Sequence, residues 1–234
     1  MKRECVRILV ESLGQKYSEI LGINLAEGRD DEIFKWFLAS VLFGAPITEA
    51  SAIKTYNAFK KNNVLTPERI LKTGWDGLVK ILDEGSYTRY DFKTADKLLE
   101  IAQNLTEEHG GSLSALNKKA SDARDLENRL KNLGKGVGDV TVSIFLRDLR
   151  DTWEKADPNP TSLVVIAAEN LGILKKAEDN ALSRLKAFWA KNKLRGKTFI
   201  NFETALLRLG KDYYRKGKCA ACPVKDDCLS RKAP

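Results

Sequence analysis

Three of the four cysteines lie close together near the end of the chain, at Cys219, Cys222 and Cys228. Their spacing, C-x2-C-x5-C, places three thiols on one short loop. Clustered thiolates bind a soft metal, either zinc or the iron of an iron–sulfur cluster. The N-terminus is charged and reads as the start of an amphipathic helix, not as a signal peptide. We therefore expect an intracellular protein, in which clustered cysteines indicate a metal site and not disulfides.

A glycine-rich turn at Gly134, Gly136 and Gly138 is the second candidate for chemistry. It separates two amphipathic patterns, whose apolar residues are Leu126, Leu130 and Leu133 before the turn and Val140, Val142, Ile144, Phe145 and Leu149 after it. Two short helices joined by such a turn form a helix-hairpin-helix. Glycines allow close approach of another surface, and the free N–H groups that start the second helix suit a phosphate oxygen.

Asp157 follows the second helix. The next residues, Asn159 and Pro160, are typical of the cap and first turn of a helix. We therefore expect a helix from Asn159, with Asp157 close to its positive end.

Together these features resemble the helix-hairpin-helix DNA glycosylases of the endonuclease III superfamily. That family carries LxGVG in the hairpin and an essential aspartate about twenty residues later; its iron–sulfur members end in C-x6-C-x2-C-x5-C. Here Gly136-Val137-Gly138 match the hairpin and Asp157 matches the aspartate. The clustered cysteines match the last three ligands. The turn is one residue longer than the family pattern, because Gly134-Lys135 replace a single residue.

The resemblance implies an all-α protein of two domains with a DNA-binding cleft between them. A helical barrel domain, residues 28–150, would end in the helix-hairpin-helix. The second domain would join residues 1–27 to residues 151–234 and carry the metal-cluster loop.

The implied activity is DNA repair, by hydrolysis of the N-glycosidic bond of a damaged or mispaired base in double-stranded DNA. The base must first leave the stack, because the bond is unreachable inside it. Breaking the bond builds positive charge on the sugar, and the Asp157 carboxylate would stabilise that charge.

Relatives that also cleave the strand carry a lysine two residues after the GVG motif. Val140 stands at that place, so we expect a monofunctional glycosylase. A bifunctional glycosylase and lyase that uses another lysine, such as the nearby Lys135, is an alternative. A non-catalytic protein that binds DNA structure is another, although it leaves the spacing of Asp157 unexplained.

DNA contacts would come from the backbone of the hairpin, without reading of sequence. The residues concerned are Gly134, Lys135, Gly136, Val137, Gly138 and Asp139. In the family a monovalent cation often bridges this hairpin to a phosphate. A family glutamine that fills the gap left by the extruded nucleotide is replaced here by Pro46, beside Ile47. Pro46 is either an apolar wedge or only the start of a helix.

The loop from Gly85 to Asp91 matches a family loop beside the substrate pocket. Tyr87, Tyr90 and Asp91 are therefore pocket candidates, with capping and packing as their alternative role. His109, the only histidine, lies in a polar turn and receives no role. The basic residues Lys191, Lys193, Arg195 and Lys197 indicate a solvated loop or a phosphate contact.

The first cysteine of the family pattern is missing, and Asp212 stands at its place. Cys5 is the one other thiol, and in the family the N-terminal helix packs beside the cluster segment. We therefore expect a [4Fe–4S] cluster held by Cys5, Cys219, Cys222 and Cys228, with zinc as the alternative metal. Cys5 as a buried apolar residue, Asp212 as ligand, and an open iron position remain alternatives.

The net charge of +8 and the pI of about 9.2 favour a polyanionic partner. No apolar run is long enough for a membrane span, so we expect a cytoplasmic monomer without membrane contact. Apolar periodicity predicts helices and no strand of real length. The expected helices cover residues 4–22, 29–42, 48–59, 75–82, 92–105, 160–171, 176–191 and 198–209. A further short helix is expected after the cap Thr66-Pro67-Glu68, and Thr48 opens the helix towards Phe59. The helix over 29–42 is apolar nearly all round, which predicts a buried central helix.

Overall fold

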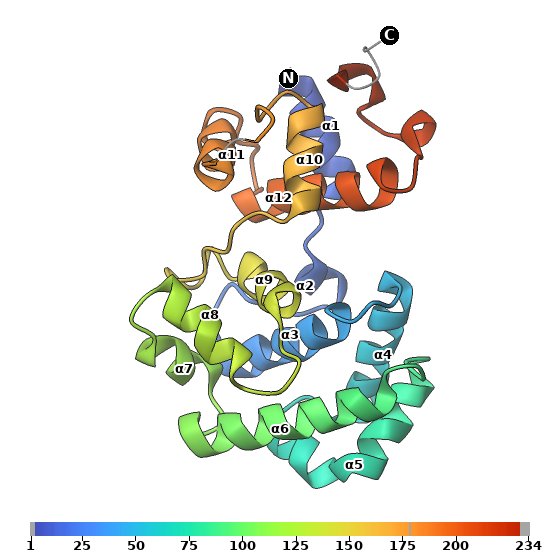
Figure 1. Ribbon diagram of the computed structural model, residues 1–234, viewed down its shortest axis with the longest axis vertical. Coiled ribbons are helices and arrows are strands. Elements are labelled where there is room, and N and C mark those ends of the chain that lie inside the picture. The colour runs from blue at the N-terminus through green and yellow to red at the C-terminus, as the bar shows by residue number, and fades with distance from the viewer. Residues whose placement is uncertain (1–2, 178, 230–234) are drawn as a thin grey trace. The chain divides into compact units, whose positions relative to one another are not determined.

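The computed structural model describes residues 3–177 and 179–229, and within them the chain is helical with no β-strand (Figure 1). The all-α prediction is therefore confirmed. The α-helices are α1 (Arg3–Leu13), α2 (Tyr17–Ile20), α3 (Asp30–Phe43), α4 (Glu49–Lys61), α5 (Pro67–Glu84), α6 (Asp91–His109), α7 (Leu113–Lys119), α8 (Ala123–Lys131), α9 (Asp139–Asp148), α10 (Ser162–Asn170), α11 (Ala181–Lys191) and α12 (Phe199–Arg208). Three short turns follow, the π-helical η1 (Leu209–Tyr214) and the 3-10 turns η2 (Cys219–Ala221) and η3 (Lys225–Asp227).

The chain forms two compact units. One contains Met1–Tyr17 and Asn159–Pro234, and the other contains Ser18–Pro158. The first and last parts of the chain thus belong to one unit. The boundaries fall inside α2 and just after Asp157, so the unit of Ser18–Pro158 takes in Asp157 and the segment before it. The sequence had suggested residues 28–150 for this part.

The unit of Ser18–Pro158 is built around α3. This helix buries residues on every side, among them Ile33, Trp36, Phe37 and Leu42. It packs against α4, α7 and α9. The prediction of a buried central helix is confirmed, because an apolar helix surface on all sides must be covered on all sides.

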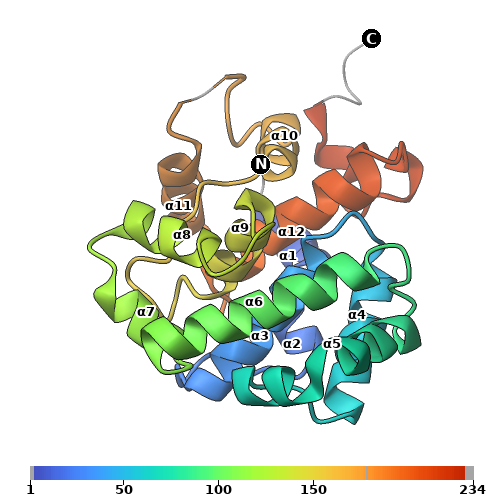
Figure 2. The same ribbon diagram turned by 60° about the horizontal axis from the view of Figure 1, so that its bottom comes forward.

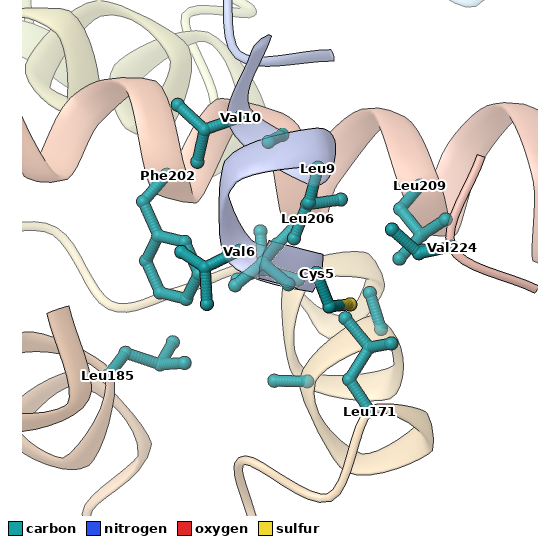
Figure 3. Packing of buried hydrophobic residues seen from close by; sticks show 14 of the residues in the cluster. Cys5, Val6, Leu9, Val10, Leu171, Leu185, Phe202, Leu206, Leu209 and Val224 are labelled. Atoms are coloured by element: carbon teal, nitrogen blue, oxygen red, sulfur yellow. The ribbon is translucent and has the colours of Figure 1, made fainter. Parts of the chain in front are cut away.

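The unit of Met1–Tyr17 and Asn159–Pro234 packs α1 and α10 against α12. Its core includes Val6, Leu9, Phe202 and Leu206, and Cys5 lies in the same core near Leu171 (Figure 3). Two helices from opposite ends of the chain are therefore held together by apolar burial.

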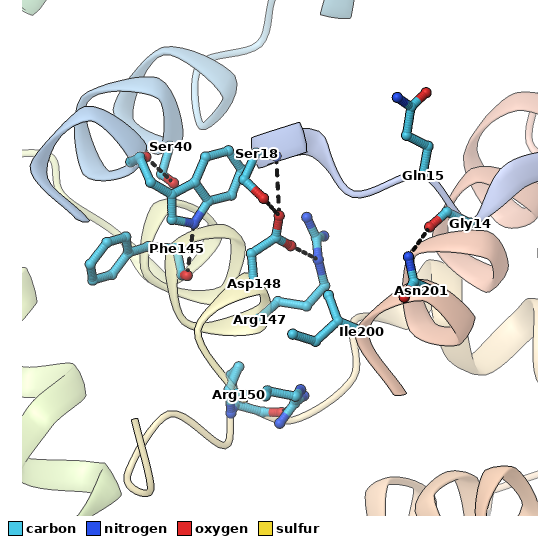
Figure 4. A network of polar contacts seen from close by, with 12 residues as sticks. Gly14, Gln15, Ser18, Ser40, Phe145, Arg147, Asp148, Arg150, Ile200 and Asn201 are labelled. Atoms are coloured by element: carbon cyan, nitrogen blue, oxygen red, sulfur yellow. Dashed lines mark hydrogen bonds and ion pairs between the residues drawn. The ribbon is translucent and has the colours of Figure 1, made fainter. Parts of the chain in front are cut away.

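The prediction of a single helix over residues 4–22 is wrong. The helix is interrupted at Gly14, between α1 and α2. A Cβ at Gly14 would lie 2.8 Å from the carbonyl oxygen of Asn201. Asn201 Nδ2 also donates a hydrogen bond of 2.8 Å to the Gly14 carbonyl (Figure 4). This close approach of α12 ends α1, so a tertiary contact overrides the apolar pattern.

Three further helix expectations need correction. The helix from Asn159 is wrong, since α10 begins at Ser162 with Thr161 as N-cap. Asn159 precedes Pro160, and a residue before proline avoids helical backbone angles. The helix expected from residue 176 begins at Ala181. His109 is not in a polar loop but is the buried last residue of α6.

The caps at Thr48 and Thr66 are confirmed. Their side chains accept hydrogen bonds from the N–H groups of Ser51 and Arg69. The short helix predicted after Thr66 and the helix predicted over residues 75–82 are both present in α5, with a kink at Gly74, where φ is +68°. None of the described helices is long and apolar enough to cross a membrane.

Candidate functional site

The helix-hairpin-helix is present, as α8, a turn and α9. In the turn Gly136 has φ of +86°, which side chains other than glycine rarely adopt. Gly138 differs, because its φ of −103° is ordinary and a Cβ there would meet nothing within 4 Å. Gly138 is the N-cap of α9 and offers no side-chain acceptor to the first N–H groups of that helix. These N–H groups are the part of the turn that an anion could bind.

One face of α6 supports the turn (Figure 2). Asn104 Nδ2 donates 3.1 Å to the carbonyl oxygen of Leu133, and the Glu100 carboxylate accepts 2.7 Å from the N–H of Lys135. Lys97 lies against Gly136, where a Cβ would come 3.1 Å from its Cε. The N–H of Lys135, the inserted residue, is thus already bonded within the protein, which leaves the later N–H groups as the candidates for phosphate contact.

Lys97 brings a positive charge to this turn. Its side chain is half-buried, and burial lowers the pKa of its ammonium group. A cation beside the hairpin favours an anionic ligand there. The sequence did not single out Lys97, because nothing in the pattern of α6 distinguishes it from Lys93, the other lysine of that helix.

The first turn of α9 faces outward at two residues. Asp139 is largely exposed and its Oδ1 lies 2.5 Å from Lys131 Nζ. Val140 is 62% exposed, so its expected place on the apolar face of the helix is wrong. Thr141 turns inward instead, where a Cβ on Gly44 would lie 2.2 Å from its Oγ1. The apolar contacts of α9 come from Val142, Phe145 and Leu149.

The contact between Thr141 and Gly44 brings the hairpin next to the turn before α4. In that turn Pro46 is exposed and Ile47 is partly buried. The two sequence candidates for a DNA wedge thus follow, by two and three residues, the glycine that contacts the candidate phosphate-binding helix. Thr48, the N-cap of α4, fixes the end of this turn.

Asp157 lies outside any helix, in the segment that follows α9. Its carboxylate Oδ1 accepts a hydrogen bond from Arg150 Nη1, and Arg150 Nη2 donates 2.5 Å to the carbonyl oxygen of Pro158. The Arg150 side chain is 5% exposed, whereas the Asp157 side chain is 37% exposed. The carboxylate is thus held from the protein side and remains open to solvent. The sequence missed Arg150, which precedes Asp157 by seven residues in an irregular segment.

Other residues fix the same segment. Thr152 Oγ1 donates 3.0 Å to the carbonyl oxygen of Leu25, and Lys155 Nζ donates 2.9 Å to that of Asn117. The buried ring of Trp153 packs edge-on against Phe145 at 5.6 Å. A segment without helix is therefore ordered by side-chain contacts up to the candidate aspartate.

A buried carboxylate anchors the end of α9. Asp148 accepts hydrogen bonds from the N–H and Oγ of Ser18, at 3.2 and 3.0 Å, and from Arg147 Nε at 3.1 Å (Figure 4). Trp36 Nε1 donates 3.0 Å to the carbonyl oxygen of Phe145. The Asp148 bonds tie α9 to α2 and the Trp36 bond ties it to α3, which fixes α9 and with it the hairpin at its other end.

The three pocket candidates differ in burial and in their partners, although the rings of Tyr87 and Tyr90 meet edge-on at 6.4 Å. Tyr87 is buried, and its hydroxyl donates 3.2 Å to the carbonyl oxygen of Leu42, which fits the packing alternative. Tyr90 is the N-cap of α6 and lies under the guanidinium of Arg89. The Asp91 carboxylate accepts a bond from the N–H of Phe92, which fits capping.

All four cysteines are free and belong to one unit, with Cys5, Cys222 and Cys228 buried and Cys219 exposed. Burial, the Asp227 carboxylate and the charge of Cys222 raise the pKa of Cys5 to about 12. Burial and the charges of Cys228 and Cys219 likewise raise the pKa of Cys222. Cys222 thus lies within electrostatic range of the other three thiols, and four thiols are a donor set that suits a soft metal. In the described ranges 3–177 and 179–229, no three Cys, His, Asp or Glu side chains are already gathered as a metal site.

The two carboxylates near the cysteines differ in their partners. Asp212 lies 2.8 Å from Lys216 Nζ and 3.5 Å from Lys211 Nζ. Asp227 instead accepts a hydrogen bond from the Cys5 thiol and was not singled out by the sequence. The Tyr214 hydroxyl lies 3.3 Å from Cys228 Sγ. Of the two expected fourth ligands, Cys5 lies within electrostatic range of Cys222, and Asp212 pairs with two lysines.

The basic run between α11 and α12 is exposed at Lys191, Lys193, Arg195 and Lys197. Exposure fits both the solvated loop and the phosphate contact.

The chain matches no protein-family model, and no curated protein matches it. The function proposed below therefore depends on the residues and the geometry described above.

Proposed function

We propose that the protein is a DNA glycosylase that hydrolyses the N-glycosidic bond of a damaged or mispaired base in duplex DNA. The observation that carries the proposal is the pairing of a glycine hairpin, whose N–H groups open α9, with an accessible carboxylate at Asp157. Both belong to the unit of Ser18–Pro158. The net charge of +8 supports a polyanionic partner.

In this mechanism the N–H groups at the start of α9 bind a backbone phosphate, and Lys97 adds positive charge beside them. These contacts hold duplex DNA without reading its sequence. Pro46 and Ile47 occupy the space that an extruded nucleotide leaves, since apolar side chains can separate stacked bases. A monovalent cation at the hairpin belongs to the same proposal.

Asp157 acts once the base has left the stack. Cleavage of the N-glycosidic bond leaves positive charge on the deoxyribose, and a fixed carboxylate stabilises that charge and orients the attacking water. The departing base takes the bonding electron pair and gains a proton, while water supplies the hydroxyl group that replaces the base on the sugar and releases the matching proton. Val140 offers no amine, so the proposed reaction ends with an abasic site in an intact strand.

The test uses duplexes with one uracil, hypoxanthine, alkylated purine, oxidised guanine, or thymine opposite guanine. We expect base release from at least one duplex, and loss of that release by about three orders of magnitude in Asp157→Asn, because a neutral amide cannot stabilise the charge. Binding of the same duplex should survive. Full activity in Asp157→Asn would remove the carboxylate from the mechanism.

A non-catalytic DNA-binding protein is the second candidate, and the Arg150–Asp157 ion pair favours it. In that case Asp157 only anchors its segment to Arg150. The prediction differs sharply: wild-type protein would bind the duplexes and release no base from any of them. Loss of binding together with loss of stability in Asp157→Asn would support this second candidate.

We also propose that Cys5, Cys219, Cys222 and Cys228 hold a [4Fe–4S] cluster, with zinc as the alternative. Four thiolates suit either metal. The metal would fix the C-terminal loop to α1 and supply no step of base removal. The lysines of that loop, Lys216, Lys218 and Lys225, would then stand ready to meet DNA phosphates.

A further inference from the structure

Arg150 is the buried cation closest to the proposed chemistry, and the reaction as described leaves it without a role. An arginine side chain at 5% exposure loses most of its hydration, which is unfavourable unless its donors are bonded. Its two terminal nitrogens go to adjacent residues, to the Asp157 carboxylate and to the Pro158 carbonyl. One planar group therefore fixes a side chain and the backbone that follows it.

No helix supports Asp157, because α9 ends at Asp148 and α10 begins only at Ser162. Backbone bonds around it are short-range, such as that from its own N–H to the carbonyl of Lys155. The rotamer of the carboxylate thus depends on side-chain contacts, and Arg150 makes one of them directly with Oδ1.

We infer that Arg150 is a positioning residue, which orients the Asp157 carboxylate toward the deoxyribose during base release. The inference rests on the proposed glycosylase function. Arg150 acts through Asp157 and does not itself touch the DNA. Because a misplacement of about 1 Å can reduce a rate by about a hundredfold, losing this contact should lower the rate of the chemical step.

The test compares Arg150→Met and Arg150→Lys with wild type, on the duplex that wild type cleaves best. Single-turnover release at saturating protein reports the chemical step, and a separate titration reports affinity for the duplex. We expect Arg150→Met to release base about 10- to 100-fold more slowly with unchanged affinity. Arg150→Lys keeps the charge and one bond, so it should recover part of the rate.

Lys155→Met is the matched control. Lys155 is another cation that ties the same segment to backbone carbonyls, those of Asn117 and Ala120, without touching Asp157. Its loss should lower the thermal midpoint about as much as Arg150→Met does, yet leave the release rate near that of wild type. Equal slowing in both variants would overturn the inference, since the rate would then follow the order of the segment alone.

The double variant Arg150→Met/Asp157→Asn gives an independent measure. If Arg150 acts through Asp157, adding Arg150→Met to Asp157→Asn should cost no further rate. If Arg150→Met slows release by the same factor in the Asp157→Asn background as in wild type, the inference is overturned. Where Arg150→Met fails to fold, Arg150→Lys replaces it in the same comparison. Lysine fits both hydrogen bonds poorly, so an unchanged release rate in Arg150→Lys would count against positioning.

The two proposals fail in different ways. A wild type that releases no base from any duplex, or a fully active Asp157→Asn, contradicts the glycosylase function and the inference with it. An active wild type, an inactive Asp157→Asn and a fully active, folded Arg150→Met contradict the inference alone.

Discussion

At the scale of single residues, position 140 decides which chemistry the hairpin can support. Val140 is the second residue of α9 and projects into solvent at the candidate DNA-binding end of the helix. A lysine here would present its amine to the DNA, and an amine can attack the sugar to form a Schiff base. Valine cannot, which limits the proposed enzyme to hydrolysis.

We therefore predict that product strands remain intact until hot alkali is added. Borohydride should trap no covalent adduct between wild-type protein and DNA. Val140→Lys should fold as stably as wild type, within about 0.5 kcal/mol, because the side chain is exposed. A trapped adduct with wild type would show that another lysine, such as Lys135 or Lys97, serves as nucleophile.

Tyr87 illustrates how one contact changes the expected role of a residue. Its hydroxyl donates to the carbonyl oxygen of Leu42 in the core, so Tyr87→Phe should reduce the free energy of unfolding by about 1 kcal/mol. The set of bases released should be unchanged. A changed preference among damaged duplexes, at unchanged stability, would restore Tyr87 to the substrate pocket.

At the scale of elements, the hairpin depends on α6 as much as on its own glycines. Lys97, Glu100 and Asn104 lie at helical spacing on one face of α6. They contact, in that order, Gly136, Lys135 and Leu133 of the turn. The α8 and α9 helices could be predicted from their apolar patterns, and the turn from its glycines. This support could not, because polar residues on a helix face read as solvent-exposed until a partner is known.

The two glycines of the GVG motif should behave differently when replaced. Gly136→Ala forces a positive φ on alanine and should cost about 1–2 kcal/mol of stability. Gly138→Ala should be nearly neutral for folding, since a Cβ there meets nothing. Gly138→Asp should fold as well as Gly138→Ala but bind duplex DNA weakly at every sequence, because its carboxylate repels the phosphate.

Affinity for undamaged duplex at several salt concentrations checks this prediction. Wild type and Gly138→Ala should weaken steeply as salt rises, and Gly138→Asp should be weaker throughout. Equal binding by Gly138→Asp and Gly138→Ala would show that the hairpin is not where DNA binds.

At the scale of the whole molecule, the two ends of the chain form one unit. Arg208 Nη1 donates 2.7 Å to the carbonyl oxygen of Leu13, and Asn201 bonds to Gly14, so α12 fixes the end of α1. The same core buries Cys5 with Cys222 and Val224. The two lengths of chain are therefore joined by packing and hydrogen bonds before any metal is considered.

Local sequence patterns predicted most of the helices and singled out the residues whose side chains could take part in chemistry. They did not predict the break at Gly14, the exposure of Val140 or the partner of Asp157. Each of these depends on a contact between residues distant from one another or on a segment without periodicity. Asp227 was missed for the same reason, since only the packing of α1 on the C-terminal loop brings it to Cys5.

The proposed [4Fe–4S] cluster would give the purified protein a colour and an iron content that can be measured. Protein purified without oxygen should be brown, absorb near ~400 nm and contain about four irons per chain. Cys5→Ser and Cys222→Ser should both lose iron and lower the thermal midpoint. Val6→Ala is the matched control, because Val6 is buried in the same core on the same helix and carries no thiol. It should lower the midpoint and keep its iron.

Since a metal bond would close a loop over nearly the whole chain, chelation should expose both α1 and the C-terminal loop to proteolysis together. Full iron in Cys5→Ser would make Cys5 a core residue and turn attention to Asp212 and Asp227, and a colourless protein with one zinc would replace the cluster while leaving the chemistry at Asp157 untouched.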